Sequence, residues 1–253
     1  MEIIFETFGK VAVIRLNRPE QRNAVDMAMM AGFKSALARL EEDKDIRVAV
    51  LTGAGRVFCA GMDLGAFARG ERPGLTEPVG FAGFVRAART KPVIAAVNGG
   101  AFAGGFELML ACDMAIAEEE AQFGLPEVKR GLVAAGGGAH RLPRRIPIAI
   151  ANEMLLTGDP ITAERALALG LVNRVVPGAD LLSAAMELAG RIAATAPLAL
   201  KLTLALSRKA AAAQEDALWA ENAAIWAQID GSHDALEGAK SFKERRPPVW
   251  HAG

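Results

Sequence analysis

The sequence predicts an α/β fold in which short buried strands end in glycine-rich loops. Strand-like and helix-like segments alternate through the first half of the chain. Two largely apolar runs, RVAVLTG and KPVIAAVNG, end at glycine, as buried strands followed by tight turns do. From about Pro143 onward the sequence becomes mainly helical.

The N-terminal segments, taken in order, predict a hairpin, a loop, a helix and a strand. IIFETF and VAVIRL alternate as strands on either side of Gly9 and Lys10, and the polar loop LNRPEQRNAV follows them. Asp26 is placed to cap an amphipathic helix that runs to about Glu42. The β-branched run RVAVLTG then predicts a buried strand ending at Gly53.

The middle of the chain predicts loops that follow strands. After the loop GAGRVFCAGMDL comes ARGERPGLTEP, rich in Gly, Pro and charge, and a helix is expected near residues 79–90. KPVIAAVNG predicts a second buried strand, a helix is expected to begin near Gly104, and DMAIAEEEAQFG supplies another strand and turn.

Alanine-rich segments dominate the C-terminal part, and one of them carries an apolar face. QEDALWAENAAIWAQID fits packing within the subunit and contact between subunits equally well, because large aromatic residues serve both. The residues near its one helical face are Leu218, Asn222, Ile225, Trp226 and Ile229.

Composition indicates an ordinary globular protein of 253 residues, 52% hydrophobic and 23% charged, with one large domain or a domain and a small appendage. A net charge of zero gives no sign of nucleic-acid or anionic-membrane binding. Residues 93–112 contain Asn98, Glu107 and four glycines, so a strand, a turn and a helix are expected there instead of a membrane span. The N-terminus resembles no targeting segment, and a cytoplasmic location is expected.

The sequence does not contain the motifs of several common classes of enzyme. There is no G-x-S-x-G elbow, no G-x-x-x-x-G-K-[ST] and no G-x-G-x-x-G. His140, His233 and His251 lack H-E-x-x-H spacing, so no metal is expected. Cys59 and Cys112 lie in apolar runs and are expected to be buried free thiols in a reducing compartment.

Apart from Asn98 and the closing Asp113, the segment VNGGAFAGGFELMLACD is apolar or small except for one carboxylate, Glu107, and burial of an unpaired charge costs several kcal/mol. If a helix begins near Gly104, its first N–H groups lack partners, and glycine lets a ligand oxygen approach them. The loop VFCAGMDL follows a buried strand in the same way. The two loops could form an oxyanion hole, or they could be tight turns beside a glutamate stabilised by the helix dipole.

Six segments, in order and with matching spacing, resemble the crotonase (enoyl-CoA hydratase/isomerase) superfamily over nearly the whole chain. They are LNRPEQRNA at 16–24, GAGRVFCAGMDL at 53–64, KPVIAAVNGGAFAGGFELMLACDMAIAEEEAQFGLPEVKRGL at 91–132, GGGAHRLPRRI at 136–146, EMLLTGDPITAERALALGLVNRVVP at 153–177, and FKERRPP near the end.

The resemblance implies a crotonase-like spiral of ββα units over residues 1–195 and a C-terminal helical region over 196–253 that drives trimer formation. It implies a homotrimer, with trimers often pairing into hexamers. The implied partner is an acyl-CoA substrate, and no separate cofactor is expected because CoA is part of that substrate. The thioester oxygen is expected to lie between two backbone N–H groups.

Matched position by position, these two donors are the N–H groups of Met62 and Gly104. Gly65 stands where many relatives carry a lysine that approaches the CoA phosphates, so Arg22 or a residue of another subunit is expected to replace it. The residues that match the CoA-binding stretch are Arg22, Ala24, Ala60, Met62, Asp63 and Leu64. Phe242 and Arg245 match C-terminal positions that reach a neighbour's adenine in some relatives.

Hydratases of this superfamily carry two glutamates, which match Glu107 and Glu127 here. The resemblance implies syn hydration of a trans-2-enoyl-CoA, in which Glu107 activates the water that attacks C3 and Glu127 delivers a proton to C2. Because two carboxyl groups this close titrate jointly, no fixed charge is assigned to either.

Three other functions remain open. The chain also resembles the carnitinyl-CoA dehydratase branch, which uses the same glutamate pair on a charged acyl group. Δ3,Δ2-enoyl-CoA isomerisation and a non-catalytic acyl-CoA-binding role are the others, and the presence of both glutamates argues against the last. The expected pocket residues are apolar and favour a plain acyl chain: Met62, Phe81, Phe84 and Phe102.

Overall fold

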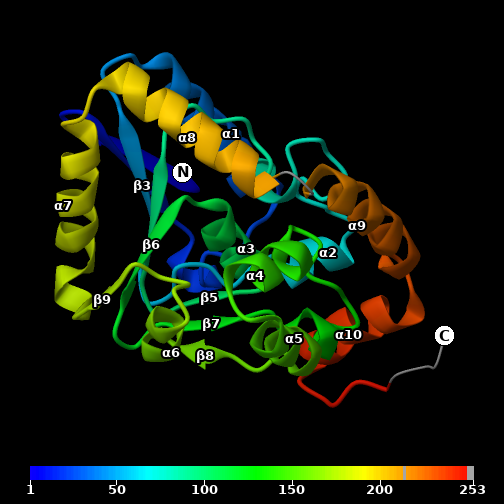
Figure 1. The fold of residues 1–253 in the computed structure, drawn as a ribbon. Helices are drawn as coiled ribbons and strands as arrows, with labels where there is room; N and C mark the ends of the chain where they lie inside the picture. The colour runs from blue at the N-terminus through cyan, green and yellow to red at the C-terminus, as the bar shows by residue number, and fades with distance from the viewer. Residues whose placement is uncertain (213–214, 250–253) are drawn as a thin grey trace.

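The computed structural model describes residues 1–212 and 215–249, and its centre is a pair of β-sheets surrounded by helices (Figure 1). In this part of the chain the larger sheet has the strand order β1-β2-β3-β4-β6-β9 and the smaller sheet the order β5-β7-β8. The strands are β1 Ile3–Phe8, β2 Val11–Leu16, β3 Val48–Gly53, β4 Val93–Val97, β5 Gly100–Phe102, β6 Met114–Glu118, β7 Gln122–Gly124, β8 Ile161–Thr162 and β9 Arg174–Val176.

The larger sheet is buried on both faces, which explains why its central strands read as continuous apolar runs. In β3, Val48 and Val50 belong to one hydrophobic cluster and Ala49 and Leu51 to another. Helix α7 (Leu181–Ala193) packs on the first face, at the left of Figure 1. The loops and helices that build the candidate site cover the second face.

From β4 to β7 consecutive strands alternate between the two sheets, and this alternation makes that part of the chain a spiral. The β4 strand pairs in the larger sheet, β5 follows it into the smaller one, and helix α3 (Gly104–Ala111) returns the chain. The next pair, β6 and β7, repeats the step and lies parallel to the first. Each turn of the spiral therefore ends in a loop on the same side of the molecule.

Most of the expected elements in the first half are confirmed. The hairpin pairs Phe8 with Val11 across the predicted turn. Helix α1 spans Met27–Glu42, and the Asp26 carboxylate accepts a hydrogen bond from the Met29 amide at 2.9 Å. The remaining α-helices are α2 Leu64–Ala68, α4 Gly138–Arg145, α5 Ile148–Thr157, α6 Ala163–Ala168, α8 Pro197–Ala212, α9 Glu215–Ile229 and α10 His233–Glu244.

The prediction of a helix near residues 79–90 is wrong. Only a single 3₁₀ turn, Phe81–Gly83, forms there. Gly80, Ala82 and Gly83 all have positive φ, at 69°, 60° and 67°, and an α-helix does not tolerate such angles in succession. The segment is thus an irregular loop that holds Phe81 against the candidate site.

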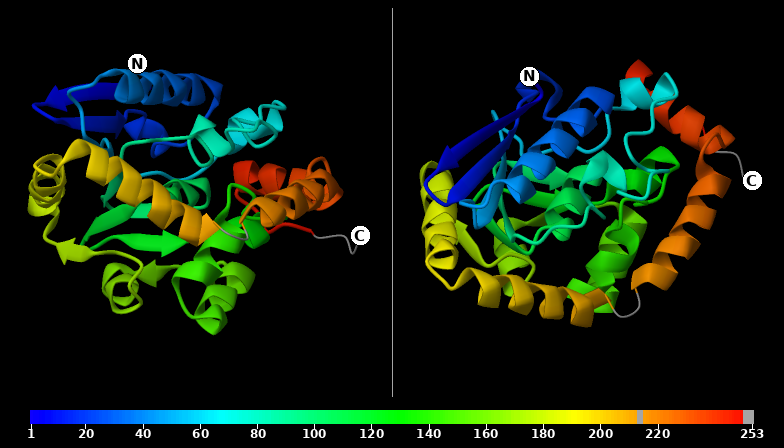
Figure 2. Two further views of the ribbon diagram at one scale, coloured as in Figure 1. Left: turned by 45° about the horizontal axis from the view of Figure 1, so that its top comes forward. Right: turned by 90° about the horizontal axis from the view of Figure 1, so that it is seen from above.

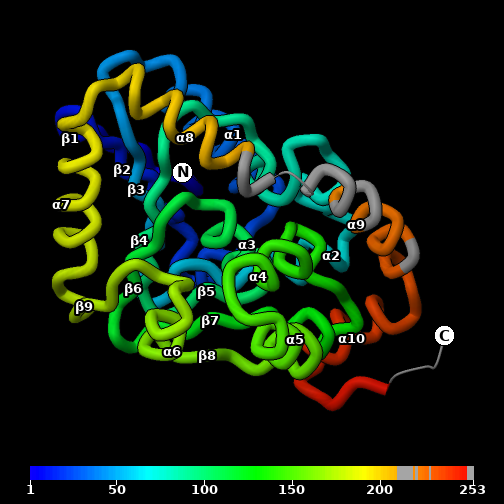
Figure 3. The backbone as a smooth tube through the Cα atoms, viewed as in Figure 1, coloured from blue at the N-terminus to red at the C-terminus, as the bar shows by residue number. Residues whose placement is uncertain are grey.

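The C-terminal helices follow one another around the outside of the two sheets (Figures 2 and 3). Helix α10 returns to contact α2 and the 3₁₀ segment Pro126–Arg130. Helix α8 exposes a stripe of leucines at 68%, 59% and 70%, namely Leu198, Leu202 and Leu206. Trimer formation through this region, and the division at residue 195, stay predictions.

The apolar face expected on α9 is only partly correct. Trp226 is buried and Asn222 donates a hydrogen bond to the Ala135 carbonyl at 2.7 Å, so these two side chains face the core. Ile225 is 42% exposed and points elsewhere. The side chain of Leu218 lies outside the described part of the structure.

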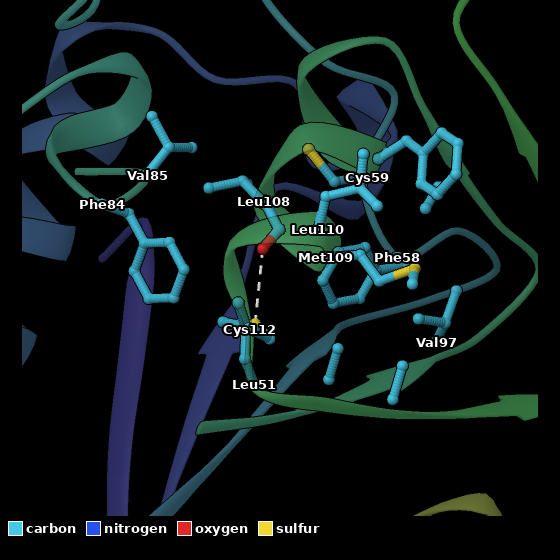
Figure 4. Packing of buried hydrophobic residues seen from close by; sticks show 14 of the residues in the cluster. Leu51, Phe58, Cys59, Phe84, Val85, Val97, Leu108, Met109, Leu110 and Cys112 are labelled. Carbon is cyan, nitrogen blue, oxygen red and sulfur yellow. Dashed lines mark hydrogen bonds between the residues drawn. The ribbon is translucent and has the colours of Figure 1, made fainter. Parts of the chain in front are cut away.

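Residues 93–112 form the expected strand and buried helix, and between them lies a second short strand, β5, that was not expected. Within the described residues, no individual helix has the length and hydropathy needed to cross a bilayer, although the pair Gly178–Ala193 and Pro197–Lys209, bent by 109°, satisfies both measures jointly. The core around α3 contains both cysteines as free buried thiols (Figure 4). Burial raises the pKa of each to about 12, and Cys112 donates to the Leu108 carbonyl at 3.3 Å.

Candidate active site

Three loops meet beside the smaller sheet because short bridges extend its hydrogen bonding. Val25 pairs with Met62, and Cys59 pairs with Ala101 of β5. The Ala103 amide then donates to the Gly124 carbonyl at the end of β7. Segments that are far apart in the sequence therefore lie side by side at the N-terminus of α3.

The two segments that carry the amides expected to form an oxyanion hole lie against each other. Gly104 is the first residue of α3, so its N–H has no acceptor one turn earlier within the helix. A Cβ added to Gly61 would lie 3.0 Å from the Gly104 nitrogen, which places the loop before Met62 directly against the helix start. The Asp63 amide donates to Val25, and in this extended strand the Met62 amide faces the opposite side.

Glu107 lies in the first turn of α3 with its carboxylate buried and held by a second glycine loop. One carboxylate oxygen accepts a hydrogen bond from the Gly138 amide at 2.8 Å, where α4 begins, and the Gly136 backbone is a second donor. Burial nevertheless raises its pKa from 4.5 to about 7, because desolvation outweighs these donors and the nearby Arg141 guanidinium. The carboxyl group can therefore exchange a proton near neutral pH.

Glu127 lies at the start of the segment Pro126–Arg130, and its carboxyl group is also buried. Desolvation, followed by the nearby charge of Glu107, raises its pKa well above the usual value. Among the described residues its Oε2 has no hydrogen-bond partner. A buried oxygen without a hydrogen-bond partner is rare in folded proteins, and a buried carboxyl group with a strongly raised pKa is a candidate for a functional residue.

Stability should depend on pH through these two carboxyl groups. Because the folded-state pKa of Glu107 is raised to about 7, the native state holds its proton more tightly than the unfolded chain does. Its stabilising contribution is complete below about pH 4 and is lost as the pH rises through about 7. We expect the Glu107→Gln and Glu127→Gln variants, which cannot ionise, to gain stability relative to the wild type between pH 5 and pH 8.

Urea denaturation at those two pH values measures the effect. The matched control is Glu187→Gln on α7, a largely exposed glutamate in ion pairs with Arg174 and Arg191. It should show no comparable gain at pH 8. Equal pH dependence in all three variants and the wild type would contradict the expectation.

The residues matched to a CoA-binding stretch form one continuous strip. The Ala60 amide donates to the Arg22 carbonyl at 3.0 Å, so the two segments run alongside each other. Ala24, Met62 and Leu64 are half-buried along it. Their contact with CoA stays a prediction.

Asp63 has a structural role within that strip. Its carboxylate caps α2 by accepting from the Ala66 amide at 3.0 Å and forms an ion pair with Arg18 at 3.2 Å. Arg18 also reaches Asp26 at 3.1 Å, and it thereby fastens the loop before α1 to the loop before α2. The sequence did not predict this structural role of Arg18, which lies within the segment LNRPEQRNA that matches the family.

The outer residues of the expected CoA site are exposed. Arg22 has a positive φ of 51° and points to solvent. Phe242 is 53% exposed on α10, with the Arg130 guanidinium 4.9 Å from its ring centroid, and Arg245 ends that helix. The expected contact of Phe242 and Arg245 with a neighbouring subunit's ligand stays a prediction.

A cavity of about 290 Å³ borders the site at Phe81 and Ala135, and its lining differs from the expected apolar pocket. Phe81 lines it, but Phe84 does not, because its ring packs in the core 5.3 Å from that of Phe33. Met62 and Phe102 also lie outside its lining. Its lining includes polar and charged side chains: Glu77, Arg86 and Asn222.

The glycine run 136–138 was missed as part of the site. It supplies the amides that hold Glu107, and a Cβ on Gly136 would lie 2.3 Å from the Glu107 Oε2. The available signal was three glycines directly before a helix, a pattern that suits anion binding. The site thus contains the start of α3, the loop that carries Met62, and two buried carboxyl groups with raised pKa values.

Comparison with known proteins agrees with this geometry. The sequence model of the enoyl-CoA hydratase/isomerase family matches residues 6–253. A carnitinyl-CoA dehydratase of Proteus mirabilis strain HI4320 is 43% identical over 251 residues, which are 96% of each chain. The solved structure of a carnitinyl-CoA dehydratase from Mycobacterium avium 104 is 43% identical with a TM-score of 0.92, covering 100% of this chain and 99% of that one.

An enoyl-CoA hydratase from Mycobacterium tuberculosis H37Rv is similar over the same extent. It is 47% identical with a TM-score of 0.80, and the match covers 100% of this chain and 99% of that chain. The expected spiral fold is thereby confirmed.

Proposed function

The chain belongs to the enoyl-CoA hydratase/isomerase family, and on that premise we propose that it is a hydro-lyase which adds water reversibly to trans-2-enoyl-CoA thioesters. The observation that carries the proposal is the pair Glu107 and Glu127, buried together with raised pKa values beside the N-terminus of α3. A hydration needs one group to take a proton and another to give one, and this pair supplies both.

The reaction balances with these residues alone. Water attacks C3 while Glu107 accepts its proton, and the C2–C3 π electrons move onto the thioester oxygen as an enolate. The Met62 and Gly104 amides stabilise that oxyanion. Glu127 then delivers a proton to C2, the carbonyl re-forms, and the product is a 3-hydroxyacyl-CoA. The reverse sequence eliminates water.

Dehydration of a carnitinyl-CoA ester is the second candidate, because relatives at 43% identity carry that name. It would use the same glutamates and differ only in the acyl group. Isomerisation of a Δ3-enoyl-CoA needs only one carboxyl group, which carries a proton between C2 and C4. The second buried glutamate would then have no role in the reaction.

A panel of CoA esters tests the proposal. We expect the purified protein to remove the conjugated enoyl-thioester absorbance of crotonyl-CoA and to form a 3-hydroxyacyl-CoA, identified by mass from the gain of one water. Conversion of a Δ3-enoyl ester to the Δ2 ester with no hydrated product would favour isomerisation. Tight binding of every ester without turnover of any would favour a binding role.

A further inference from the structure

Arg141 lies against the glycine run that holds the Glu107 carboxylate. It belongs to α4, three residues after Gly138, whose amide donates to that carboxylate at 2.8 Å. The guanidinium group folds back towards the start of the helix, since a Cβ built on Gly137 would lie 3.1 Å from its Nη1. The charged end of Arg141 therefore contacts the middle glycine of the run, while the outer two, Gly136 and Gly138, hold Glu107.

Two further contacts fix the position of the guanidinium group. Its Nη2 donates to the Val85 carbonyl at 2.8 Å, directly after the irregular loop that carries Phe81. Its Cζ lies 5.4 Å from the ring centroid of Trp219 on α9. That ring also covers the glycine run, because two of its carbons would lie 3.3 Å from a Cβ on Gly137. The charge of Arg141 thus acts from a defined place beside the site.

Within the described residues, two charged groups face the Glu107 carboxyl group. Glu127, on the segment Pro126–Arg130, disfavours a second negative charge beside its own. Arg141, on α4, favours the ionised form of Glu107. The other arginines that contact α3, Arg89 and Arg145, donate to carbonyl oxygens at or just beyond its C-terminal end. Arg141 is therefore the cation placed to act on Glu107.

The groups around Arg141 itself are also basic or aromatic. Arg86 lies 4.7 Å from the Trp219 ring centroid, and His140 packs edge-on against the same ring at 4.6 Å. The glycine run between Arg141 and Glu107 is buried and has no side chains. Charges separated by buried protein interact more strongly than charges in water, so the effect of Arg141 on Glu107 is little screened.

We propose that Arg141 is a positioning residue for the hydration, which supports the glycine run that holds Glu107 and favours the ionised form of that carboxyl group. The inference rests on the proposed function, in which Glu107 has to be ionised to accept a proton from water. It adds a side chain that does not touch the substrate and that determines how far the pH can fall before the base is lost.

The pH dependence of kcat/KM for crotonyl-CoA tests the inference. Arg141→Gln keeps a donor for the Val85 carbonyl and removes the charge, so Glu107 should hold its proton to a higher pH. We expect the acidic limb of the profile to move up by about one pH unit, which is about a tenfold loss below the limb, and the alkaline plateau to change little. Arg141→Lys keeps the charge and should leave the limb in place. A purely structural role would lower the whole profile without moving the limb.

A titration without substrate measures Glu107 directly. The Glu127→Gln background removes the partner that titrates jointly with it. In that background, the infrared band of a protonated carboxyl group that Glu107→Gln abolishes reports Glu107 alone, and Arg141→Gln should raise its midpoint as well. Arg141→Met, which can still pack on the Trp219 ring, takes the place of Arg141→Gln if that variant does not fold.

Arg145→Gln is the matched control. Arg145 is on the same helix and also donates to backbone carbonyls, at 3.0 and 3.2 Å, but at the other end of α3. Its loss should move neither the acidic limb nor the infrared midpoint.

The outcomes separate this inference from the proposed function. An unchanged limb and midpoint in Arg141→Gln would overturn the role of Arg141 and keep the hydratase. Equal shifts in Arg141→Lys or in Arg145→Gln would show that the charge at position 141 is not the cause, and would overturn it as well. No hydration by the wild type would overturn the proposed function, while the infrared midpoint would still decide the effect of Arg141 on Glu107.

Discussion

Replacement of either buried glutamate by glutamine should lower kcat for hydration of crotonyl-CoA by about 10²–10⁴-fold, the usual contribution of a general acid or base. Glutamine has nearly the same shape but cannot exchange a proton. At position 127 the change removes the carboxyl oxygen that has no partner among the described residues. At position 107 the amide oxygen can still accept from Gly138, so the helix start should keep its structure.

The double variant gives the sharper result. If Glu107 and Glu127 act on one water molecule, the loss in Glu107→Gln/Glu127→Gln should scarcely exceed the loss in a single variant, because groups that act as a unit are not additive. Steady-state rates and the Kd for a non-reactive acyl-CoA measure chemistry and binding separately. A loss confined to Glu127→Gln would contradict hydration and favour isomerisation, and full activity in both single variants would contradict catalysis by the pair.

The fold could be predicted where local patterns decide it. The β-branched strands, the Asp26 cap and the glycine before α3 each carry their signal within a few residues, and all are found where expected. The segment near residue 80 was not predictable in this way. Its apolar spacing resembles a helix, but Gly80 and Gly83 have positive φ, and the positive φ of Ala82, at 60°, has no local sign because alanine ordinarily favours helix.

In the candidate site, too, some features have a local signal in the sequence and others do not. The glycine loops after strands are visible in the sequence, whereas the assignment of the Met62 and Gly104 amides and of the glutamate pair follows from the resemblance to the family. The contact between Glu107 and Gly138 joins residues 31 positions apart, and no periodicity marks it.

A methyl group at position 136 should lower kcat by about 100-fold without changing a single titratable group. A Cβ on Gly136 would lie 2.3 Å from the Oε2 and 2.8 Å from the Cδ of Glu107, so the carboxylate has to move. Displacement of a catalytic group by about 1 Å can cost roughly 100-fold in rate. Gly136 does not have a positive φ, so alanine suits its backbone and the effect reports the contact with Glu107.

Comparison with Gly190→Ala and with Glu107→Gln decides how the Gly136→Ala effect arises. A Cβ on Gly190, in α7, meets nothing within 4 Å, so that alanine should stabilise the helix by about 0.5–1 kcal/mol and leave kcat unchanged. If Gly136 acts through Glu107, adding Gly136→Ala to Glu107→Gln should cost little further activity. An undiminished 100-fold loss in that background would mean that the methyl group disturbs Phe81, whose Cβ lies 3.1 Å from the same position, instead of the carboxylate.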